Sequence, residues 1–496
     1  MKRRHKPEVV HGSCERVRDA GADPVVAPAS AIGRPQAKSG TFPSRFASSI
    51  ATTFAFSSVT AELATLAWPI AAATLGETAM GLVDTKLVGG LGAAALGGVG
   101  VAATLMHLFY SLTYGGMRGV KVQTAHAIGE GHPSRGFDYA RAGILVGFAI
   151  GFVVLLACRD VTPLLRGMGM DAEIVPYARD FLAAVTLGGP ATCALSALIQ
   201  HRQGIGDSRT PMVIGIAGNV LNAGLAYALI YGHLGLPALG VRGAGYATAT
   251  TEWLEMSFML ALFLRDERRA APGGGRLAFG PAARGVIEIG LPTGLHFVVE
   301  GIAFTAFTAV LGSLGKEEIA AHQIALNVIR VSFLPGIAVA DATTVLVGRA
   351  LGRRRLDEAD ATTKSAIKLA VGFMAICGVG FALGGRVLAS FFTANPLVIH
   401  TARNLLIVAA VFQVLDAINI VLRGALRGAK DVRIVAAIGI VATWTCLPAS
   451  AWFLGRMAGL GALGGWLGFV GETMIAATLF WRRWNRGGWR KAYAPA

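Results

Sequence analysis

Long apolar runs separated by short polar segments make up most of this chain of 496 residues. No formal charge falls between Lys86 and Arg118, or between Arg209 and Arg242. A helix of about 20 apolar residues crosses the roughly 30 Å hydrocarbon core of a bilayer, so each of these runs is long enough to span it. The pattern predicts an all-α integral membrane protein with about twelve transmembrane helices, at residues 61–87, 93–117, 137–158, 173–199, 211–231, 243–264, 286–312, 319–348, 363–386, 397–424, 433–455 and 460–481.

The composition excludes a soluble globular protein. Hydrophobic residues make up 54% of the chain, charged residues 15%, and the mean hydropathy is +0.56, whereas soluble domains are about 25% charged. A net charge of +16 can indicate a nucleic-acid partner. Here the basic residues cluster between the apolar runs, where they anchor topology, so we expect no such partner. Five scattered cysteines without a CxxC pair indicate neither a disulfide framework nor a zinc site.

The polar segments divide the chain into two groups of helices. Residues 1–58 lack a compact apolar region and a cleavage site, so they do not form a signal peptide. We interpret them as a disordered cytoplasmic tail, or as the product of a start codon assigned too far upstream. A polar, glycine-rich linker at 265–285 separates an N-lobe of six helices (59–264) from a C-lobe of six (286–482), and residues 483–496 form a cytoplasmic tail. Lys and Arg are concentrated in the loops on the same side as the amino terminus. Because cytoplasmic loops carry an excess of these residues, we expect both termini to lie in the cytoplasm.

The two groups of helices repeat one another. A constant shift along the sequence lays Pro69 on Pro292, Glu77 on Glu300 and Thr85 on Thr308, and a slightly longer shift lays Gly204 on Gly428 and Asp207 on Asp431. Because each half has an even number of spans, both halves have the same orientation in the membrane. We therefore expect two lobes related by an axis along the membrane normal, with a cavity between or within them, an architecture that suits alternating access.

Carboxylates inside the apolar spans are the most informative residues, because a charge at the bilayer centre costs about 2.5–3.5 kcal/mol on insertion scales. Glu77 and Asp84 lie seven residues apart in the first span, and His296 lies four before Glu300 in the seventh, so each pair shares a helix face. Asp84 could be solvated at the end of its span, and Glu77 could be a structural hydrogen-bonding group. We predict instead that Glu77, Asp84 and Glu300 bind a coupling ion or proton.

The tenth span carries Gln413, Asp416 and Asn419 as a polar stripe at helical spacing. We assign Asp416 to the ion or proton group, and Gln413 and Asn419 to the lining of a substrate cavity. Interior histidines and asparagines more often satisfy a neighbouring helix than bind a ligand, but three more are candidates for this lining: Asn222, His296 and His322.

No enzyme motif is present in the sequence: it contains no GxxxxGK[ST] phosphate loop, no HExxH and no GxSxG. Without a nucleotide site, uphill transport would draw on an ion gradient. We expect no enzymatic activity and no cofactor other than a coupling ion.

Several ordered motifs between residues 61 and 482 resemble the multidrug and toxic compound extrusion (MATE) transporters. They are Met80-Gly-Leu-Val-Asp-Thr-Lys-Leu-Val-Gly-Gly-Leu-Gly92, Gly290-Leu-Pro292 with Glu300, Ala320-Ala-His-Gln323, Leu346-Val-Gly-Arg-Ala-Leu-Gly352, and Gln413-Val-Leu-Asp416 followed by Leu426-Arg-Gly428. The resemblance implies twelve helices in two lobes and antiport of drugs or organic cations against H⁺ or Na⁺. In the NorM-type branch it implies coupling roles for Asp84, Glu300 and Asp416, with a candidate Na⁺ site at Glu300 and Asp416.

Two positions depart from that branch. Phe412 stands where a tyrosine is frequent, four residues before Asp416, which removes an oxygen ligand. Arg330 stands in the middle of the eighth span with Asp341 eleven residues on, and we expect Arg330 to pair with Glu300 or Asp416 and to compete with sodium.

The sequence thus predicts a monomeric multidrug exporter of the bacterial inner membrane that acts on small organic cations without a protein partner. A lipid-linked precursor flippase of the same superfamily is the nearest alternative. A membrane-embedded enzyme, or a receptor or purely structural protein, fits less well, because no catalytic dyad is present and buried acids recur at equivalent positions.

Overall fold

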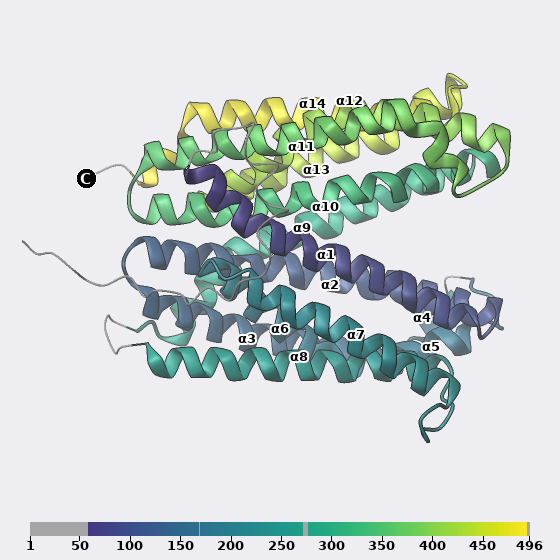
Figure 1. Ribbon diagram of the computed structural model, residues 1–496, viewed down its shortest axis with the longest axis horizontal. Coiled ribbons are helices and arrows are strands. Elements are labelled where there is room, and N and C mark those ends of the chain that lie inside the picture. Colours follow the sequence, from purple (N-terminus) through teal and green to yellow (C-terminus); the bar gives the residue numbers. More distant parts are fainter. Residues whose placement is uncertain (1–57, 168, 271–275, 494–496) are drawn as a thin grey trace, which may run out of the picture. The chain divides into compact units, whose positions relative to one another are not determined.

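The computed structural model describes residues 58–167, 169–270 and 276–493 (Figure 1). The secondary structure of these residues is helical throughout, with no strand among them, as the sequence predicts. The predicted tail at residues 1–58 lies almost wholly outside the described residues. So do the middle of the 265–285 linker and the last three residues of the C-terminal tail.

The helices follow one another along the chain with short connections. The first half contains α1 (Ser58–Gly89), α2 (Ala93–Gly129), α3 (Pro133–Ala157), α4 (Thr162–Gly167), α5 (Val175–Val185), η1 (Thr186–Gly188), α6 (Gly189–Gly204), α7 (Arg209–Tyr231) and α8 (Val241–Arg269). The second half contains α9 (Phe279–Gly312), α10 (Lys316–Gly352), α11 (Leu356–Ser390), α12 (Pro396–Gly428), α13 (Val432–Ser450), η2 (Ala451–Met457), α14 (Gly461–Arg486) and η3 (Gly488–Ala492).

Eleven helical segments of the described chain are long and apolar enough to cross a membrane. Two of them join neighbouring elements: one runs from α5 through η1 to α6, and the other joins α13 to the π-helix η2. The remaining long helix is α8, whose apolar sequence is interrupted by Glu252 and Glu255. Together these segments account for the twelve spans that the sequence predicts.

Several helices run beyond the predicted boundaries. The clearest case is the predicted span 93–117, which is Ala93–Gly129 in the structure. The apolar pattern ends at the first charge, Arg118, but Arg118 and Lys121 are buried and paired with Asp341, so the helix continues without exposing them. Tertiary ion pairs of this kind extend a helix past the point at which its apolar pattern ends.

Two lobes emerge from the packing of these helices. In the first half, α3 packs on α6, α7 on α8, and α8 on both α5 and α6. In the second half, α12 is the central helix, packed on α10, α11 and α14, and α13 packs on α9 and α14. Figure 1 draws the first set from purple to teal and the second from green to yellow.

The lobes meet through α2, which packs on α9 and α10, and through α1, which packs on α10. Glycines allow α2 and α9 to approach closely: a Cβ at Gly290 would overlap the carbonyl oxygen of Gly116, and one at Gly119 would overlap that of Val286. Small residues let helix backbones come together in this way in membrane proteins. The contact between α2 and α9 therefore depends on the absence of side chains.

A second close approach joins the ends of α2 and α10, where a Cβ at Gly129 would overlap the carbonyl oxygen of Arg349. At the same end of the bundle α1 begins at Ser58 and α12 ends at Gly428. His126 of α2 is hydrogen-bonded through Nε2 to the carbonyl oxygen of Gly428, at 2.8 Å. We call this end, defined by Ser58, Gly129, Arg349 and Gly428, the Gly129 end.

Candidate functional site

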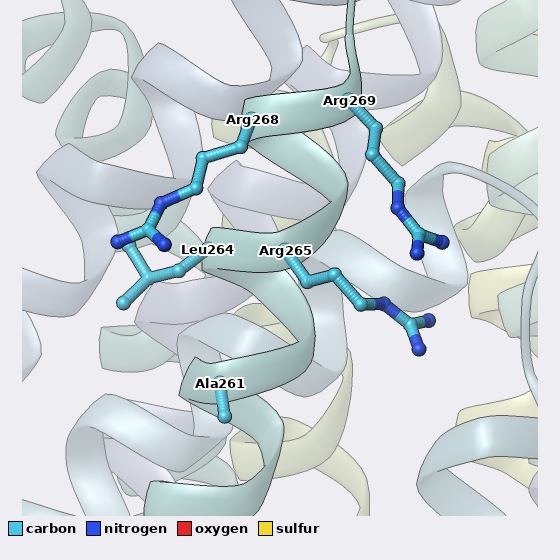
Figure 2. Close-up of a pocket in the computed structure, with 5 residues that line it drawn as sticks. All are labelled: Ala261, Leu264, Arg265, Arg268 and Arg269. Atoms are coloured by element: carbon cyan, nitrogen blue, oxygen red, sulfur yellow. The ribbon is translucent and has the colours of Figure 1, made fainter.

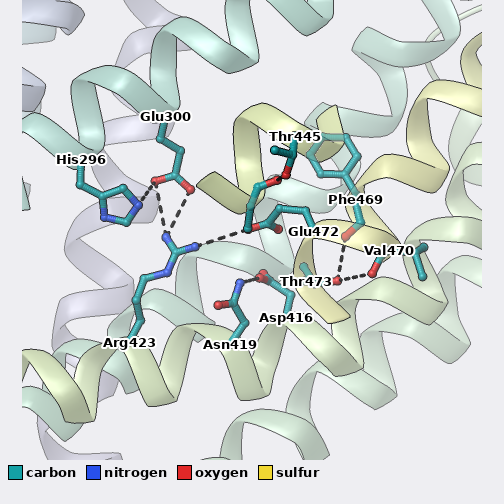
Figure 3. A network of polar contacts seen from close by, with 11 residues as sticks. His296, Glu300, Asp416, Asn419, Arg423, Thr445, Phe469, Val470, Glu472 and Thr473 are labelled. Carbon is teal, nitrogen blue, oxygen red and sulfur yellow. Dashed lines mark hydrogen bonds and ion pairs between the residues drawn. The ribbon is translucent and has the colours of Figure 1, made fainter. Parts of the chain in front are cut away.

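The main candidate site lies in the second lobe, where side chains of α9, α12 and α14 converge (Figure 3). Helix α9 supplies Glu300, α12 supplies Asp416 and Arg423, and α14 supplies Glu472. Asp416 and Arg423 are seven residues apart, so two helical turns place both on one face of α12. Three carboxylates and one arginine thus meet among helices whose other surfaces are apolar.

Arg423 bridges two of these carboxylates with the two ends of its guanidinium group. Its Nη1 atom lies 3.2 Å from Oε1 and 3.4 Å from Oε2 of Glu300, and its Nη2 atom lies 3.8 Å from Oε1 of Glu472. The side chains of Arg423 and Glu472 are 12% and 8% exposed, whereas that of Glu300 is 32% exposed. Glu300 is therefore the member that solvent reaches most easily. The negative charge of the buried Glu472 is compensated by the guanidinium of Arg423.

The polar stripe predicted on α12 is present, and its members are buried. Asn419 donates from Nδ2 to Oδ1 of Asp416 at 3.1 Å, and Gln413 donates from Nε2 to Oγ of Ser332 on α10 at 2.8 Å. Asp416 and Asn419 therefore belong to the network around Arg423, while Gln413 joins α12 to α10.

The face shared by His296 and Glu300 on α9 is also formed. Nε2 of His296 lies 3.7 Å from Oε2 of Glu300, and the histidine is 1% exposed. Its ring fits against Gly439 of α13, where any Cβ would overlap the imidazole. His296 is thus packed in the interior beside Glu300.

The expected pairing of Arg330 with Glu300 or Asp416 is wrong. Arg330 is exposed on α10 and makes no hydrogen bond or ion pair with another described residue. Glu300 pairs with Arg423, which lies on α12. Helical spacing places Arg330 and Asp341 near one face of α10, but it does not show which neighbouring helix offers a nearer cation.

Asp341 instead joins the two lobes. Its Oδ1 lies 3.0 Å from Nη1 of Arg118, and its Oδ2 lies 3.2 Å from Nζ of Lys121, both from α2. Asp341 and Lys121 are each 1% exposed. The guanidinium of Arg118 also stands over the ring of Phe297, 5.0 Å from its centroid. A buried ion-pair cluster thus holds α2 of the first lobe to α10 of the second.

The first lobe gathers carboxylates without a basic partner among the described residues. Glu77 is exposed and Asp84 partly exposed on α1, and neither makes a hydrogen bond or ion pair with another residue of the described chain. On α8, Glu252 accepts a hydrogen bond from the hydroxyl of Thr192. Glu255 packs where Gly218 of α7 leaves room for it, and its charged neighbours are Glu252 and Glu77.

Two predicted cavity residues serve other contacts. Asn222 is 6% exposed and donates from Nδ2 to Oγ1 of Thr248 at 3.3 Å, which joins α7 to α8. His322 is fully buried, and its Nδ1 accepts a hydrogen bond from Nε1 of Trp466 at 3.1 Å. His322 is also surrounded by the rings of Phe304 and Phe307. It is therefore part of the hydrophobic core of the second lobe.

Sequence reasoning missed the role of four ionisable residues: Arg118, Lys121, Arg423 and Glu472. The basic residues stand near the predicted ends of spans, where Lys and Arg commonly anchor topology. A signal was available for Arg423, which follows Asp416 by two helical turns. In the structure, Glu472 and Glu252 take equivalent places, since each stands eleven residues after the first residue of its helix, Gly461 and Val241.

The loop after α12 brings a basic residue to the Gly129 end. Lys430 lies between α12 and α13 with φ at 62°. Burial lowers the pKa of Lys430 below its ordinary value, while the negative charge of Glu130, in the loop after α2, acts in the opposite direction. This end is thus closed by polar groups from both lobes.

A separate surface hollow lies at the end of α8 and contains none of the predicted site residues. Its lining comes from that one helix, with three arginines that point to different sides of the helix end (Figure 2): Ala261, Leu264, Arg265, Arg268 and Arg269. We regard it as a feature of the basic end of the helix.

Metal-binding geometry is not found among the described residues, since no group of three or more His, Cys, Asp or Glu side chains could hold a metal ion. Glu300 and Glu472 point at the guanidinium of Arg423, whereas the carboxylate of Asp416 accepts a hydrogen bond from Asn419 (Figure 3). The candidate sodium site at Glu300 and Asp416 therefore does not fit this arrangement.

Comparison with protein families gives a match to the model described as MatE, over residues 69–228 and 292–452. The two matched stretches begin at Pro69 and Pro292, the pair that the internal repeat superimposes.

Curated relatives match over most of their length. The chain is 32% identical over 439 residues to "Probable multidrug resistance protein NorM" of Burkholderia pseudomallei, covering 85% of this chain and 92% of the relative. It is 31% identical over 430 residues to the protein of the same name from Xanthomonas campestris pv. campestris, covering 85% and 93%.

Solved structures share the fold. "Crystal structure of MATE in the straight conformation" matches with a TM-score of 0.79 at 23% identity, covering 87% of this chain and 97% of that chain. "Crystal structure of eukaryotic MATE transporter AtDTX14" matches with a TM-score of 0.77 at 18% identity, covering 88% and 97%.

Proposed function

The chain belongs to the MatE family, and on that premise we propose that it is a secondary active exporter of organic cations that exchanges its substrate for protons or sodium ions. Its relatives in Burkholderia and Xanthomonas carry the name of a probable multidrug resistance protein. We further infer that it works as a single chain in the bacterial inner membrane.

The observation that carries this proposal is the network of Glu300, Asp416, Arg423 and Glu472 inside membrane-spanning helices. Ionisable groups at such depth are costly, and they persist where they serve ion pathways or proton relays. Glu300 is the most exposed of the paired carboxylates, so a proton or a competing cation would reach it first.

Alternating access requires contacts between the lobes that form on one side of the membrane and break on the other. The Arg118–Lys121–Asp341 cluster and the bond from His126 to Gly428 are contacts between the lobes on the side of the Gly129 end. We infer that the Gly129 end is cytoplasmic, following the distribution of Lys and Arg in the loops. The lobes would then be closed toward the cytoplasm, and export would require these contacts to open.

A single coupling charge that moves down the membrane potential can drive the export of an uncharged solute. One elementary charge falling through 100 mV releases about 2.3 kcal/mol. That free energy corresponds to roughly fifty-fold accumulation of an uncharged solute at 25 °C. Exchange of one coupling ion per cycle therefore suffices for an uncharged substrate. A monovalent organic cation exchanged one for one moves no net charge, so its export draws on the concentration gradient of the coupling ion or on a second coupling ion.

Substitution of the coupling carboxylates tests the proposal. We expect Glu300→Gln and Asp416→Asn, each in proteoliposomes, to reduce ethidium transport driven by an imposed pH or sodium gradient to the level of empty vesicles. The reason is that an amide can neither release a proton nor hold a cation by charge.

Glu288→Gln is the matched control, because Glu288 lies on the same helix as Glu300 but is 52% exposed and pairs with Arg284 one turn away. It should transport as the wild type does. Gradient-driven transport at the wild-type rate in both Glu300→Gln and Asp416→Asn would rule out the assigned roles. Absence of transport by the wild type on either gradient would rule out the exporter itself.

A further inference from the structure

Arg423 holds a position among carboxylates that a bound metal cation could otherwise take. Its guanidinium lies between Glu300 of α9 and Glu472 of α14, within 3.2 Å of the first and 3.8 Å of the second (Figure 3). Asp416 is also among the negative charges that act on it. A positive charge fixed to α12 thus stands at the point where the carboxylates of the second lobe converge.

Acidic and basic side chains are equal in number in the larger cluster to which this site belongs. Arg427, one turn after Arg423, acts on both Glu300 and Asp341, and so connects the site to the ion pairs between the lobes. The cluster then contains four acidic side chains and four basic ones: Glu300, Asp341, Asp416 and Glu472, with Arg118, Lys121, Arg423 and Arg427. An additional metal cation would therefore meet as many basic side chains as acidic ones.

The internal repeat shows that this cation is specific to the second lobe. The shift that lays Gly204 on Gly428 also lays Ile199 on Arg423. The first lobe has carboxylates on the corresponding helices, with Glu77 on α1 and Glu252 on α8, but an apolar side chain at this position of α6. The basic residue is thus a local addition to one lobe and not a requirement of the repeated fold.

Removal of Arg423 from the carboxylates is also disfavoured by its environment. Its side chain is 12% exposed, and an arginine keeps its charge under all ordinary conditions. A guanidinium offers donors in a fixed planar fork that fits two carboxylates at once. A sodium ion would have to displace this group and lose its own water, and the displaced guanidinium would then be buried without a partner.

We propose that Arg423 is a tethered cation that occupies the carboxylate cluster of the second lobe and excludes sodium from it. This inference rests on the proposed exporter and names the residue that selects its coupling ion. A gradient that acts through Glu300 and Glu472 is then a proton gradient. The other charged groups that act on these carboxylates are His296 on α9, and Asp416 and Arg427 on α12.

Sodium binding to the purified protein tests the proposal independently of transport. We compare the melting temperature in detergent in sodium chloride with that in choline chloride of equal ionic strength. The wild type should show no difference, whereas Arg423→Leu combined with Glu472→Gln should show a saturable rise in sodium. The double variant removes the cation together with one carboxylate, so that Glu300 and Asp416 become free to bind an ion without an added charge imbalance.

Two further variants complete the comparison. Arg423→Lys keeps the positive charge and should resemble the wild type in showing no sodium response. Arg403→Leu, an exposed arginine on the same helix without a described ion pair, should also behave as the wild type. A sodium response of the wild type that Glu300→Gln abolishes would overturn the proposal. So would the absence of a response in a folded double variant, because Arg423 would then not be what excludes sodium.

Transport on separate gradients distinguishes the two levels of inference. In proteoliposomes the wild type should move ethidium on a pH gradient and not on a sodium gradient. Transport on a sodium gradient alone would refute the role of Arg423 and leave the exporter intact. Transport on neither gradient would refute the exporter, while the sodium-binding comparison would still decide what occupies the cluster. If the double variant does not fold, the wild type and Arg423→Lys still test whether sodium is excluded, because a sodium-dependent rise in the melting temperature of either protein would contradict the proposal.

Discussion

At the scale of single residues, Asp341 illustrates how a buried charge is retained only because of its partners. Arg118 and Lys121 reach it from the other lobe at 3.0 and 3.2 Å, and the aspartate is 1% exposed. Replacing one member of a buried ion pair leaves the other without compensation, which costs about 3–5 kcal/mol. Because Asp341 and its partners belong to different lobes, losing this pairing would destabilise the contact between the lobes.

We expect Asp341→Asn to lower the melting temperature of the purified protein and to make the Gly129 end more accessible, because Arg118 and Lys121 would then repel each other inside α2. Combining Asp341→Asn with Lys121→Met should restore part of the melting temperature, since the pair of uncompensated cations becomes one. Thermal unfolding followed by tryptophan fluorescence measures both effects. Equal melting temperatures for the wild type and Asp341→Asn would contradict a stabilising role for this cluster.

The residue scale is also where sequence reasoning was least complete. Helical spacing correctly grouped His296 with Glu300 and Asp416 with Asn419, because both pairs lie on one helix. Helical spacing did not predict the partner of Glu300, which is Arg423 and not Arg330, because pairing between helices depends on how the helices are rotated and how they cross. Nothing in the spacing along α10 states whether α2 or α12 presents the nearest opposite charge.

At the scale of helices, the contact between α2 and α9 relies on glycine where the lobes meet. A Cβ at Gly290 would overlap the backbone of Gly116, and one at Gly294 would overlap the carbonyl oxygen of Leu112. The obstacle in both cases is backbone, which cannot rotate away as a side chain can. Forcing extra atoms into a packed interior typically costs about 1–3 kcal/mol.

We expect Gly290→Ala to separate α2 from α9 and to reduce ethidium transport strongly, because the lobes can no longer close on each other at this point. Gly301→Ala is the matched control on the same helix, as its Cβ would meet nothing within 4 Å. Initial transport rates and melting temperatures of the two variants should be compared side by side. Similar losses in both would mean that α9 tolerates no alanine for reasons unrelated to its contact with α2.

Apolar periodicity predicted the helices in the right order but not their lengths. Ala93–Gly129 and Lys316–Gly352 exceed their predicted spans, and their charged residues Arg118 and Asp341 are buried against each other. Helix α8 likewise continues past its predicted end, where Asp266 pairs with Arg202 of α6. A hydropathy pattern predicts which residues face lipid or water. It does not show that Arg118, Asp341 or Asp266 is paired with an oppositely charged residue of another helix.

At the scale of the whole molecule, the two lobes repeat one fold but differ in charge. The first lobe holds Glu77, Glu252 and Glu255 without a described basic partner, while the second holds its carboxylates against Arg423. The two similar lobes thus differ in whether a basic side chain accompanies their buried carboxylates. The repeat was visible in the sequence, but this asymmetry required the neighbours of each carboxylate.

Orientation in the membrane is the property on which the direction of transport depends, and α11 offers a direct test because its two ends lie in short loops. Arg355 precedes the helix, and Ala394 follows it near the beginning of α12. Since the loops rich in Lys and Arg are expected to face the cytoplasm, the loop of Arg353 to Arg355 should lie inside and Ala394 outside. With the five cysteines of the chain replaced by alanine, a membrane-impermeant maleimide should label Ala394→Cys in intact cells and Arg355→Cys only after permeabilisation.

The reverse pattern would invert the chain and make the closed Gly129 end the outer one, so that the cross-lobe ion pairs would seal the protein against the exterior. Labelling of both positions in intact cells would instead show that α11 does not cross the membrane.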